Sequence, residues 1–309
     1  MKLHDLHDAW QANTLTKHEY IEAMYGLHSQ LFDYANYLKA TAISKLIISD
    51  GLVVAEARES GLRFACMPGD WRTAPIETLN FGSYEAQDAA MLMRLVQPGM
   101  IVFDIGANIG WYTLHFAHQY LNVQVHAFEP VPTTFAWLQK NIALNTIQNI
   151  FAYNFGFSDY EAELMFYLQE GFSVSASAAN LSDRQNVPNV RVRVVRFDDF
   201  ASANHLHVDL IKCDVEGAEL SVFRGAEQTL RQHRPIIFTE MLRKWAAKFG
   251  YHPNDMIAFM AGLGYTCHII FQNRLRRCSY VDETTTETNY VFLHLEQHAQ
   301  IISSFVSEH

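Results

Sequence analysis

From residue 97 onward, short apolar runs alternate with helical patterns, and this alternation constrains the fold more than any other feature of the chain. Continuous apolar runs are typical of strands that are buried on both faces, and helices between them form the crossovers of a parallel sheet. The sequence therefore predicts an α/β fold with a doubly wound, mostly parallel sheet of seven strands. The seven runs lie at residues 100–103, 123–128, 150–155, 208–213, 236–238, 266–271 and 290–295.

Residues 1–80 show a different pattern, and we expect them to form an N-terminal extension ahead of a domain at residues 81–309. Apolar residues recur at gaps of three, four or seven along a predicted helix, and Thr16 and Glu19 match a capping box at its start. Residues 51–66 predict a β-hairpin. The extension is expected to act as a lid, a specificity element or a contact in a homo-oligomer.

A long polar segment interrupts the alternation of strands and helices. Residues 170–188 are expected to form a loop that is either an active-site lid or disordered, because long loops in compact domains are usually one or the other. Residues 189–194 alternate strictly between polar and apolar side chains, which predicts a half-exposed strand.

The charge balance excludes two classes of partner. The chain has 23 Lys and Arg residues against 33 Asp and Glu residues, a formal net charge of −10. Nucleic acids and anionic membranes both select a basic face. No run approaches the ~18 apolar residues of a membrane span, and the four cysteines form no C-x-x-C pair. We therefore expect a cytoplasmic protein that binds no nucleic acid and does not cross a membrane.

The loop after the first predicted strand reads Asp104-Ile-Gly-Ala-Asn-Ile-Gly110. In a doubly wound sheet the ligand lies beyond the carboxyl ends of the central strands, so this loop is expected to contact it. The spacing differs from the G-x-G-x-x-G of a dinucleotide loop. Asp104 would repel a phosphate and attract a cation, and Gly106 and Gly110 permit close approach of the backbone. Asn108 can offer its amide to a carboxylate. S-adenosylmethionine, a cationic nucleoside that carries an amino acid, fits this loop better than NAD does.

Three further positions are predicted to contact the nucleoside. Glu129 ends the second predicted strand about 20 residues after the glycine loop, where a carboxylate commonly holds a ribose diol. Both NAD and S-adenosylmethionine carry a ribose, so Glu129 does not distinguish them. The third strand leads to Phe157 and Ser158, which can meet an adenine ring with an aromatic face and a polar edge.

Three carboxylates follow the fourth predicted strand within six residues: Asp214, Glu216 and Glu219. Burying them together is costly unless cations or shared protons compensate their charges. Glu219 matches an acidic first turn that complements a helix dipole. Asp214 and Glu216 are predicted to be functional.

Together these motifs resemble the FkbM-type S-adenosylmethionine-dependent methyltransferases. The resemblance rests on the glycine loop, on Phe128-Glu129-Pro130, and above all on Asp214-Val-Glu-Gly-Ala-Glu219 followed by Gly225. It covers roughly residues 81–295. It implies a Rossmann-like class I methyltransferase domain that methylates a hydroxyl of a sugar, glycan or secondary metabolite.

The resemblance also implies residue roles at the cofactor. Glu85, in Gly82-Ser83-Tyr84-Glu85, would lie near the methionine end, and Asp214 is counted among the cofactor contacts. Tyr112 is counted with them, although a core position explains an aromatic residue there equally well.

Methylation of a hydroxyl also requires a base that removes the hydroxyl proton, because an alcohol is a poor nucleophile at neutral pH. Candidates for the base are Asp214, Glu216, Glu240 at the end of the fifth strand, and His268 within the sixth. A lone His on a strand is more often a core residue, so the carboxylates are preferred. Asp214 and Glu240 are also predicted to hold Mg²⁺, which would lower the pKa of the hydroxyl.

Three other functions stay open from the sequence. A non-catalytic cofactor-binding or scaffold protein would keep Asp104 and Glu129 without needing Asp214 and Glu216. A nucleic-acid methyltransferase is disfavoured by the net charge of −10 and by the lack of an Asn/Asp-Pro-Pro-aromatic element after the fourth strand. A nicotinamide oxidoreductase is disfavoured by Asn108 at the position of the second glycine of a dinucleotide loop.

Overall fold

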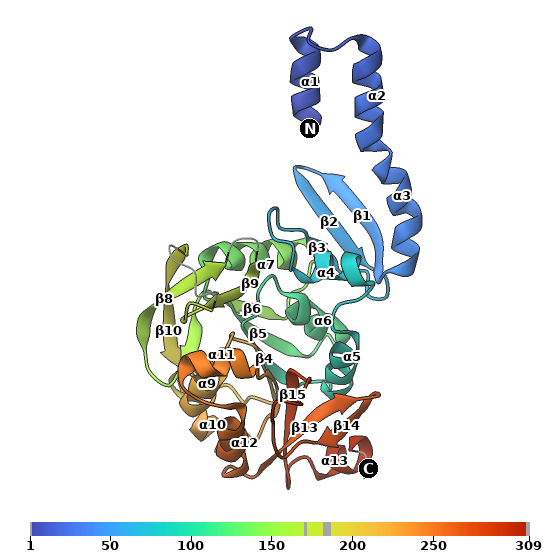
Figure 1. Cartoon of the computed structure of the whole chain (residues 1–309). Helices are drawn as coiled ribbons and strands as arrows, with labels where there is room; N and C mark the ends of the chain where they lie inside the picture. Colours follow the sequence, from blue (N-terminus) through green and yellow to red (C-terminus); the bar gives the residue numbers. More distant parts are fainter. Residues whose placement is uncertain (1, 170–171, 182–186, 307–309) are drawn as a thin grey trace.

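The computed structural model describes residues 2–169, 172–181 and 187–306, and its centre is one large sheet (Figure 1). The sheet has eight strands in the order β14-β13-β15-β12-β11-β4-β5-β6. The five strands from β12 to β6 run parallel, and β15 pairs antiparallel with both β12 and β13. The strands are β4 (Ile101–Ile105), β5 (Gln124–Phe128), β6 (Ile150–Tyr153), β11 (Leu210–Cys213), β12 (Ile236–Glu240), β13 (Tyr265–Phe271), β14 (Arg274–Arg277) and β15 (Asn289–His294).

This architecture confirms the predicted α/β fold and its seven strands. From β4 the chain proceeds to β5 and β6 on one side, and then to β11 and β12 on the other. The point of reversal between β4 and β11 is where ligands bind in such sheets. The eighth strand, β14, was not predicted. It forms a hairpin with β13 through Gln272 and Asn273, whose positive φ values of 49° and 60° fit a two-residue type I′ turn.

Helices cover both faces of the large sheet, as the continuous apolar runs predicted. Successive strand residues point to opposite faces, so Val102 packs in one core cluster, with Met91 and Phe116, while Phe103 packs in the other, with Phe223. The helices are α5 (Ala86–Leu95), α6 (Trp111–Gln119), α7 (Pro132–Leu144), α8 (Phe197–Ala203), α9 (Glu219–Gly225), α10 (Glu227–His233), α11 (Arg243–Ala246), α12 (Pro253–Ala261) and α13 (Ala299–Phe305).

A second sheet lies between β6 and α8 in the chain and corrects the prediction of a loop. Its order is β7-β10-β8-β9, with β7 at Gly156–Ser158, β8 at Ala162–Gln169, β9 at Phe172–Ser177 and β10 at Asn189–Arg196. The expected strand at residues 189–194 is confirmed as part of β10. The loop predicted at 170–188 is wrong over β9, which pairs antiparallel with β8. Residues 170–171 and 182–186 of that segment lie outside the described residues.

The N-terminal extension contains the predicted helix and hairpin. The capping box is present: Glu19 N donates to Thr16 Oγ1, and Thr16 N donates to Glu19 Oε2. The predicted hairpin is β2 paired with β3, and a further strand, β1, was missed. The elements are α1 (Leu3–Gln11), α2 (Lys17–His28), α3 (Gln30–Tyr37), β1 (Ile43–Ser49), β2 (Leu52–Ala57), β3 (Arg63–Ala65) and α4 (Ala74–Phe81).

The two ends of the extension differ in how they meet the rest of the chain. The backbone N–H groups of Arg63 and Ala65 in β3 donate to side-chain oxygens of Asn145 and Asn141 at 2.8 Å. Helices α1 and α2 project away from the rest of the molecule (Figure 1). None of the helices in the described ranges is long and apolar enough to cross a membrane.

Candidate active site

A cavity of about 770 Å³ opens at the carboxyl ends of the central strands. This volume lies in the range of small-molecule sites. The glycine loop after β4, the end of β5, the loop after β11 and the end of β12 all contribute to its lining. The cavity therefore lies where the strand order reverses between β4 and β11, as the topology predicts.

Gly106 brings two of these loops into direct contact. Its φ is +72°, and a Cβ at this position would lie 1.8 Å from the carbonyl oxygen of Asp214. Any side chain here would therefore separate the loop after β4 from the loop after β11. At Gly110 a Cβ would lie 2.5 Å from Leu138 in α7, so this glycine permits close packing of the helix.

Glu129 is the carboxylate that stabilises the glycine loop. Its Oε2 accepts a hydrogen bond from the backbone N–H of Asn108 at 3.0 Å, and its Oε1 accepts one from Val131 N at 2.9 Å. Burial raises the pKa of Glu129 to about 7. Glu129 also lines the cavity, and a carboxylate has further lone pairs that can accept hydrogen bonds from a ligand's hydroxyl groups.

Asp104 does not lie where the sequence placed it. It is fully buried and is absent from the described residues that line the cavity. Its Oδ2 accepts a hydrogen bond from Thr113 Oγ1 at 2.5 Å, and its Oδ1 lies 3.5 Å from Lys212 Nζ. Asp104 belongs to β4 itself rather than to the loop, so its side chain packs under the cavity against α6. The expectation that it faces a cationic ligand is corrected: the cation that it faces is Lys212.

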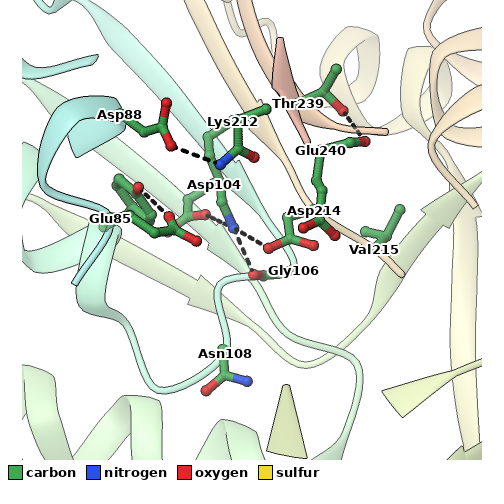
Figure 2. Close-up of polar contacts among 12 residues, drawn as sticks. Glu85, Asp88, Asp104, Gly106, Asn108, Lys212, Asp214, Val215, Thr239 and Glu240 are labelled. Atoms are coloured by element: carbon green, nitrogen blue, oxygen red, sulfur yellow. Dashed lines mark hydrogen bonds and ion pairs between the residues drawn. The ribbon is translucent and has the colours of Figure 1, made fainter. Parts of the chain in front are cut away.

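Lys212 is the charged residue that the sequence reasoning missed. Its Nζ donates to the carbonyl oxygen of Gly106 at 3.1 Å and lies 3.8 Å from Asp214 Oδ2 (Figure 2). Burial alone would lower the pKa of Lys212, but the negative charges of Asp104 and Asp214 outweigh this effect and raise it. The sequence does carry a signal for this ion pair, because Lys212 is the single charged residue of β11 (Leu210–Cys213). A charge in a buried strand needs a partner of opposite sign.

The other predicted cofactor contacts also line the cavity. Tyr112 O–H donates to Glu85 Oε2 at 2.5 Å, and burial raises the pKa of Glu85. Phe157 and Ser158 of β7 also line the cavity. Asn108, Glu85 and Tyr112 therefore share one cavity with the glycine loop, although they come from separate elements.

Asp214, Glu216 and Glu240 meet at one side of the cavity. One carboxylate oxygen from each lies within 4.8 Å of the other two. Burial raises the pKa of Glu240 to about 10 and that of Glu216 well above its ordinary range, and the charge of Asp214 adds to both effects. Asp214 Oδ1 is buried and accepts no hydrogen bond from any described residue. The cluster therefore retains protons at neutral pH, and in its ionised form it can accept a proton from a ligand or hold a divalent cation.

Glu219 has the structural role that the sequence favoured, with one addition. It is the first residue of α9, and its Oε1 accepts hydrogen bonds from the backbone N–H groups of Val215 and Gly217. Its Oε2 accepts from Tyr251 O–H. Glu219 therefore holds the loop that carries Asp214 and Glu216.

The family model described as "Methyltransferase FkbM domain" matches residues 104–267, which is more than half of the 309 residues. The chain belongs to the FkbM methyltransferase family. The matched segment begins at the buried aspartate of β4, includes Glu129 and the three clustered carboxylates, and ends in β13.

Curated relatives of this FkbM-family chain each match less than half of it. "Methyltransferase 1" of Beauveria bassiana (strain ARSEF 2860) is 33% identical over 144 residues, 41% of this chain and 58% of that protein. "31-O-demethyl-FK506 methyltransferase FkbM" of Streptomyces tacrolimicus is 32% identical over 163 residues, 43% of this chain and 61% of that protein. "2-O-methyltransferase NoeI" of Sinorhizobium fredii (strain NBRC 101917 / NGR234) is 29% identical over 160 residues, 47% of this chain and 65% of that protein. The chain thus spans less than two thirds of the length of these relatives.

His268 is the predicted candidate that the structure places elsewhere in this FkbM-family fold. It lies on β13, separated from β12 by β15, and does not appear among the described lining residues. Burial lowers its pKa to about 4, and the charge of Arg277 on β14 contributes. The ring is neutral in the core, so we do not retain His268 as a base.

This burial predicts a pH effect on stability. An unfolded His takes up a proton near pH 6.5, whereas His268 in the folded protein does so only near pH 4. The folded state is therefore disfavoured progressively as the pH falls from about 6.5 to about 4, by up to about 3 kcal/mol for this side chain. We expect urea unfolding of His268→Phe to show a shallower loss of stability over this range than wild type. Equal pH dependence in the two proteins would contradict the prediction.

Proposed function

We propose that this protein transfers the methyl group of S-adenosylmethionine to a hydroxyl oxygen of a small-molecule or glycan acceptor. The observation that carries the proposal is that the glycine loop, Glu129 and the carboxylate cluster all open into one cavity. Membership of the FkbM family and the O-methyltransferase names of two relatives support it. A net charge of −10 supports an acceptor other than nucleic acid.

The proposed cofactor contacts follow from the geometry of the glycine loop. The free lone pairs of Glu129 accept hydrogen bonds from the ribose hydroxyls, and the loop at Gly106 and Asn108 approaches the methionine portion. Glu85 lies on the same cavity and receives the ammonium group. Phe157 and Ser158 border the adenine. S-adenosylmethionine supplies an electrophilic methyl group, and the protein's part is to align it with the acceptor and exclude water.

The acceptor is proposed to enter beside the second sheet. This sheet lines the cavity with Leu164 and Phe166 of β8 and with Val194 of β10. Trp245 of α11 also lines the cavity. This wall is apolar, which favours an acceptor with an apolar body and one hydroxyl directed toward the carboxylates. Glu240 or Glu216, in its ionised form, accepts the proton of that hydroxyl as the methyl group is transferred.

A divalent cation fits the same carboxylates, and we propose Mg²⁺ there. Asp214, Glu216 and Glu240 offer hard oxygen ligands, and the buried Oδ1 of Asp214 lacks a hydrogen-bond donor among the described residues. The ion would lower the pKa of an acceptor hydroxyl. We expect MgCl₂ to raise the melting temperature of wild type and to have no effect on Asp214→Asn. An equal rise in both proteins would contradict the metal proposal, and so would full activity after exhaustive chelation.

Calorimetric titration tests the cofactor assignment. We expect S-adenosylmethionine and S-adenosylhomocysteine to bind and NAD not to bind. Glu129→Gln should weaken binding by about 10–100-fold, because hydrogen bonds to a charged group contribute about 1.5–3 kcal/mol. Glu161→Gln, on an exposed carboxylate paired with Arg193, is the matched control and should bind normally. Binding of NAD alone, or normal binding by Glu129→Gln, would overturn the assignment.

A further inference from the structure

Two of the four cysteines lie opposite each other in the hairpin of β13 and β14, at one edge of the large sheet (Figure 1). The register pairs His268 with Arg277, so Cys267 stands opposite Cys278 one step further from the turn. The backbone N–H of Cys278 donates to the carbonyl oxygen of Cys267 at 2.9 Å. Opposite residues in an antiparallel pair have Cα atoms about 4.5–5.5 Å apart, and a disulfide spans about 4.4–6.8 Å.

The two side chains point to the same face of the sheet. Both pack in one core cluster, in which Cys267 is buried and Cys278 is half-buried at the edge. Both thiols are free in this structure. The other two cysteines lie apart: Cys66 packs in a separate cluster, and Cys213 lies on β11, which β12 and β15 separate from β13. The hairpin is therefore the place where two thiols can meet.

The two thiols differ as a reactive thiol and its resolving partner differ. A hydrogen bond from the Cys267 thiol is the main cause that lowers the pKa of Cys278 to about 7, and the charge of Arg276 contributes. Glu287, which pairs with Arg276, acts in the opposite direction. Burial raises the pKa of Cys267 well above its ordinary range. Cys278 therefore supplies a nucleophilic thiolate at neutral pH, whereas Cys267 keeps its proton.

We propose that Cys267 and Cys278 form a redox-active dithiol site that reduces hydroperoxides and closes to a disulfide. The thiolate of Cys278 attacks one oxygen of the peroxide, the O–O bond breaks, and a sulfenic acid forms while the other oxygen leaves as hydroxide. The Cys267 sulfur then attacks the Cys278 sulfur, so that the S–S bond forms and the S–O bond breaks. The proton of Cys267 leaves with the sulfenic oxygen as water. With hydrogen peroxide, two thiols are oxidised and one peroxide is reduced to two waters.

The dithiol site lies beside the cavity rather than in it. Neither cysteine is among the described residues that line the cavity. The segment that begins at Cys278 leads to β15 and contacts the end of the strand that carries Glu240: Met241 donates its backbone N–H to the carbonyl oxygen of Thr288 at 2.8 Å. A disulfide would hold the start of this segment on β13. The oxidation itself needs neither a cofactor nor a methyl acceptor.

Mass spectrometry of the full-length chain, treated with a small molar excess of hydrogen peroxide at neutral pH, tests the proposal. We expect wild type to lose about 2 Da, the two hydrogens of a thiol pair, and peptide mapping to place the new bond between Cys267 and Cys278. Dithiothreitol should restore the mass. Cys278→Ser, at a half-buried position, should abolish the loss. Cys66→Ala removes a buried thiol outside the hairpin; it is the matched control and should lose the same mass as wild type.

Cys267→Ala separates the two steps of the reaction. It should stop at a sulfenic acid on Cys278, a gain of about 16 Da that dimedone traps. Three results would overturn the proposal: a wild type of unchanged mass, a loss that persists in Cys278→Ser, or a wild type in which Cys278 is oxidised without a bond to Cys267. None of these measurements involves S-adenosylmethionine, so their outcome is independent of the cofactor assignment.

Discussion

Replacing Lys212 with methionine is expected to destabilise the protein by about 3–5 kcal/mol. The substitution leaves Asp104, which has no exposed surface, without the ammonium group 3.5 Å away. Removing one partner of a buried ion pair leaves an uncompensated buried charge, and that penalty is large. Urea unfolding, monitored by circular dichroism, measures the loss.

Two further variants make the Lys212 prediction specific. Lys45→Met removes an ion pair with Glu56 in which the lysine side chain is 64% exposed, and exposed pairs contribute about 1 kcal/mol or less. Adding Asp104→Asn to Lys212→Met removes the unpaired charge and should restore part of the lost stability. If Lys212→Met and Lys45→Met destabilise the protein equally, the buried pair does not have the role assigned to it.

Glu240→Gln is expected to lower the rate of methyl transfer by about 10²–10⁴-fold, the usual contribution of a positioned acid–base group. The amide keeps the size of the side chain but cannot take up a proton at neutral pH. Binding of S-adenosylhomocysteine should be unchanged, because the proposed cofactor contacts lie on other elements. Transfer of a labelled methyl group to a panel of hydroxylated acceptors provides the measurement.

The control for Glu240 is Glu287→Gln, which removes a half-buried carboxylate that pairs with Arg276 and is absent from the described lining of the cavity. It should keep wild-type activity. Higher MgCl₂ should restore the rate of Glu240→Gln if Glu240 acts as a metal ligand and should not restore it if Glu240 acts as the base. An unchanged rate in Glu240→Gln would remove Glu240 from the mechanism.

The sequence predicted the large sheet well because its strands are continuous apolar runs with helices between them. Two of the strands that it missed, β9 and β14, lack that signature, whereas β8 carries an apolar run at residues 164–168 that the prediction overlooked. Residues 172–177 alternate serine with other small or apolar side chains in β9, and β14 contains three arginines. These segments are strands because neighbouring strands pair with them, and a single segment does not carry that information.

For the site, the sequence predicted which side chains follow the central strands. It did not predict which side chains of neighbouring strands contact one another. Asp214 and Glu240 are expected together because both follow apolar strands of one sheet. Glu216 joins them in the structure with a left-handed backbone, at a φ of +54°. Asp104 was assigned to the cavity because it precedes the glycine loop. The pairing of β4 with β11 places it opposite Lys212 instead, a contact that no local motif indicates.

The meeting of β4 and β11 also sets an order for folding. Gly106 accepts a hydrogen bond from Lys212, a residue 106 positions later in the chain, so the glycine loop has its contacts with Phe128 and Glu129 but none with β11 until the fourth central strand has been synthesised. Such long-range pairing is slow compared with the formation of local hairpins and helices. At about 5–20 residues per second, the ribosome takes roughly 5–20 s to deliver that partner. During this interval β4 lacks its neighbour β11 and presents an unpaired apolar edge, and such an edge is prone to aggregation.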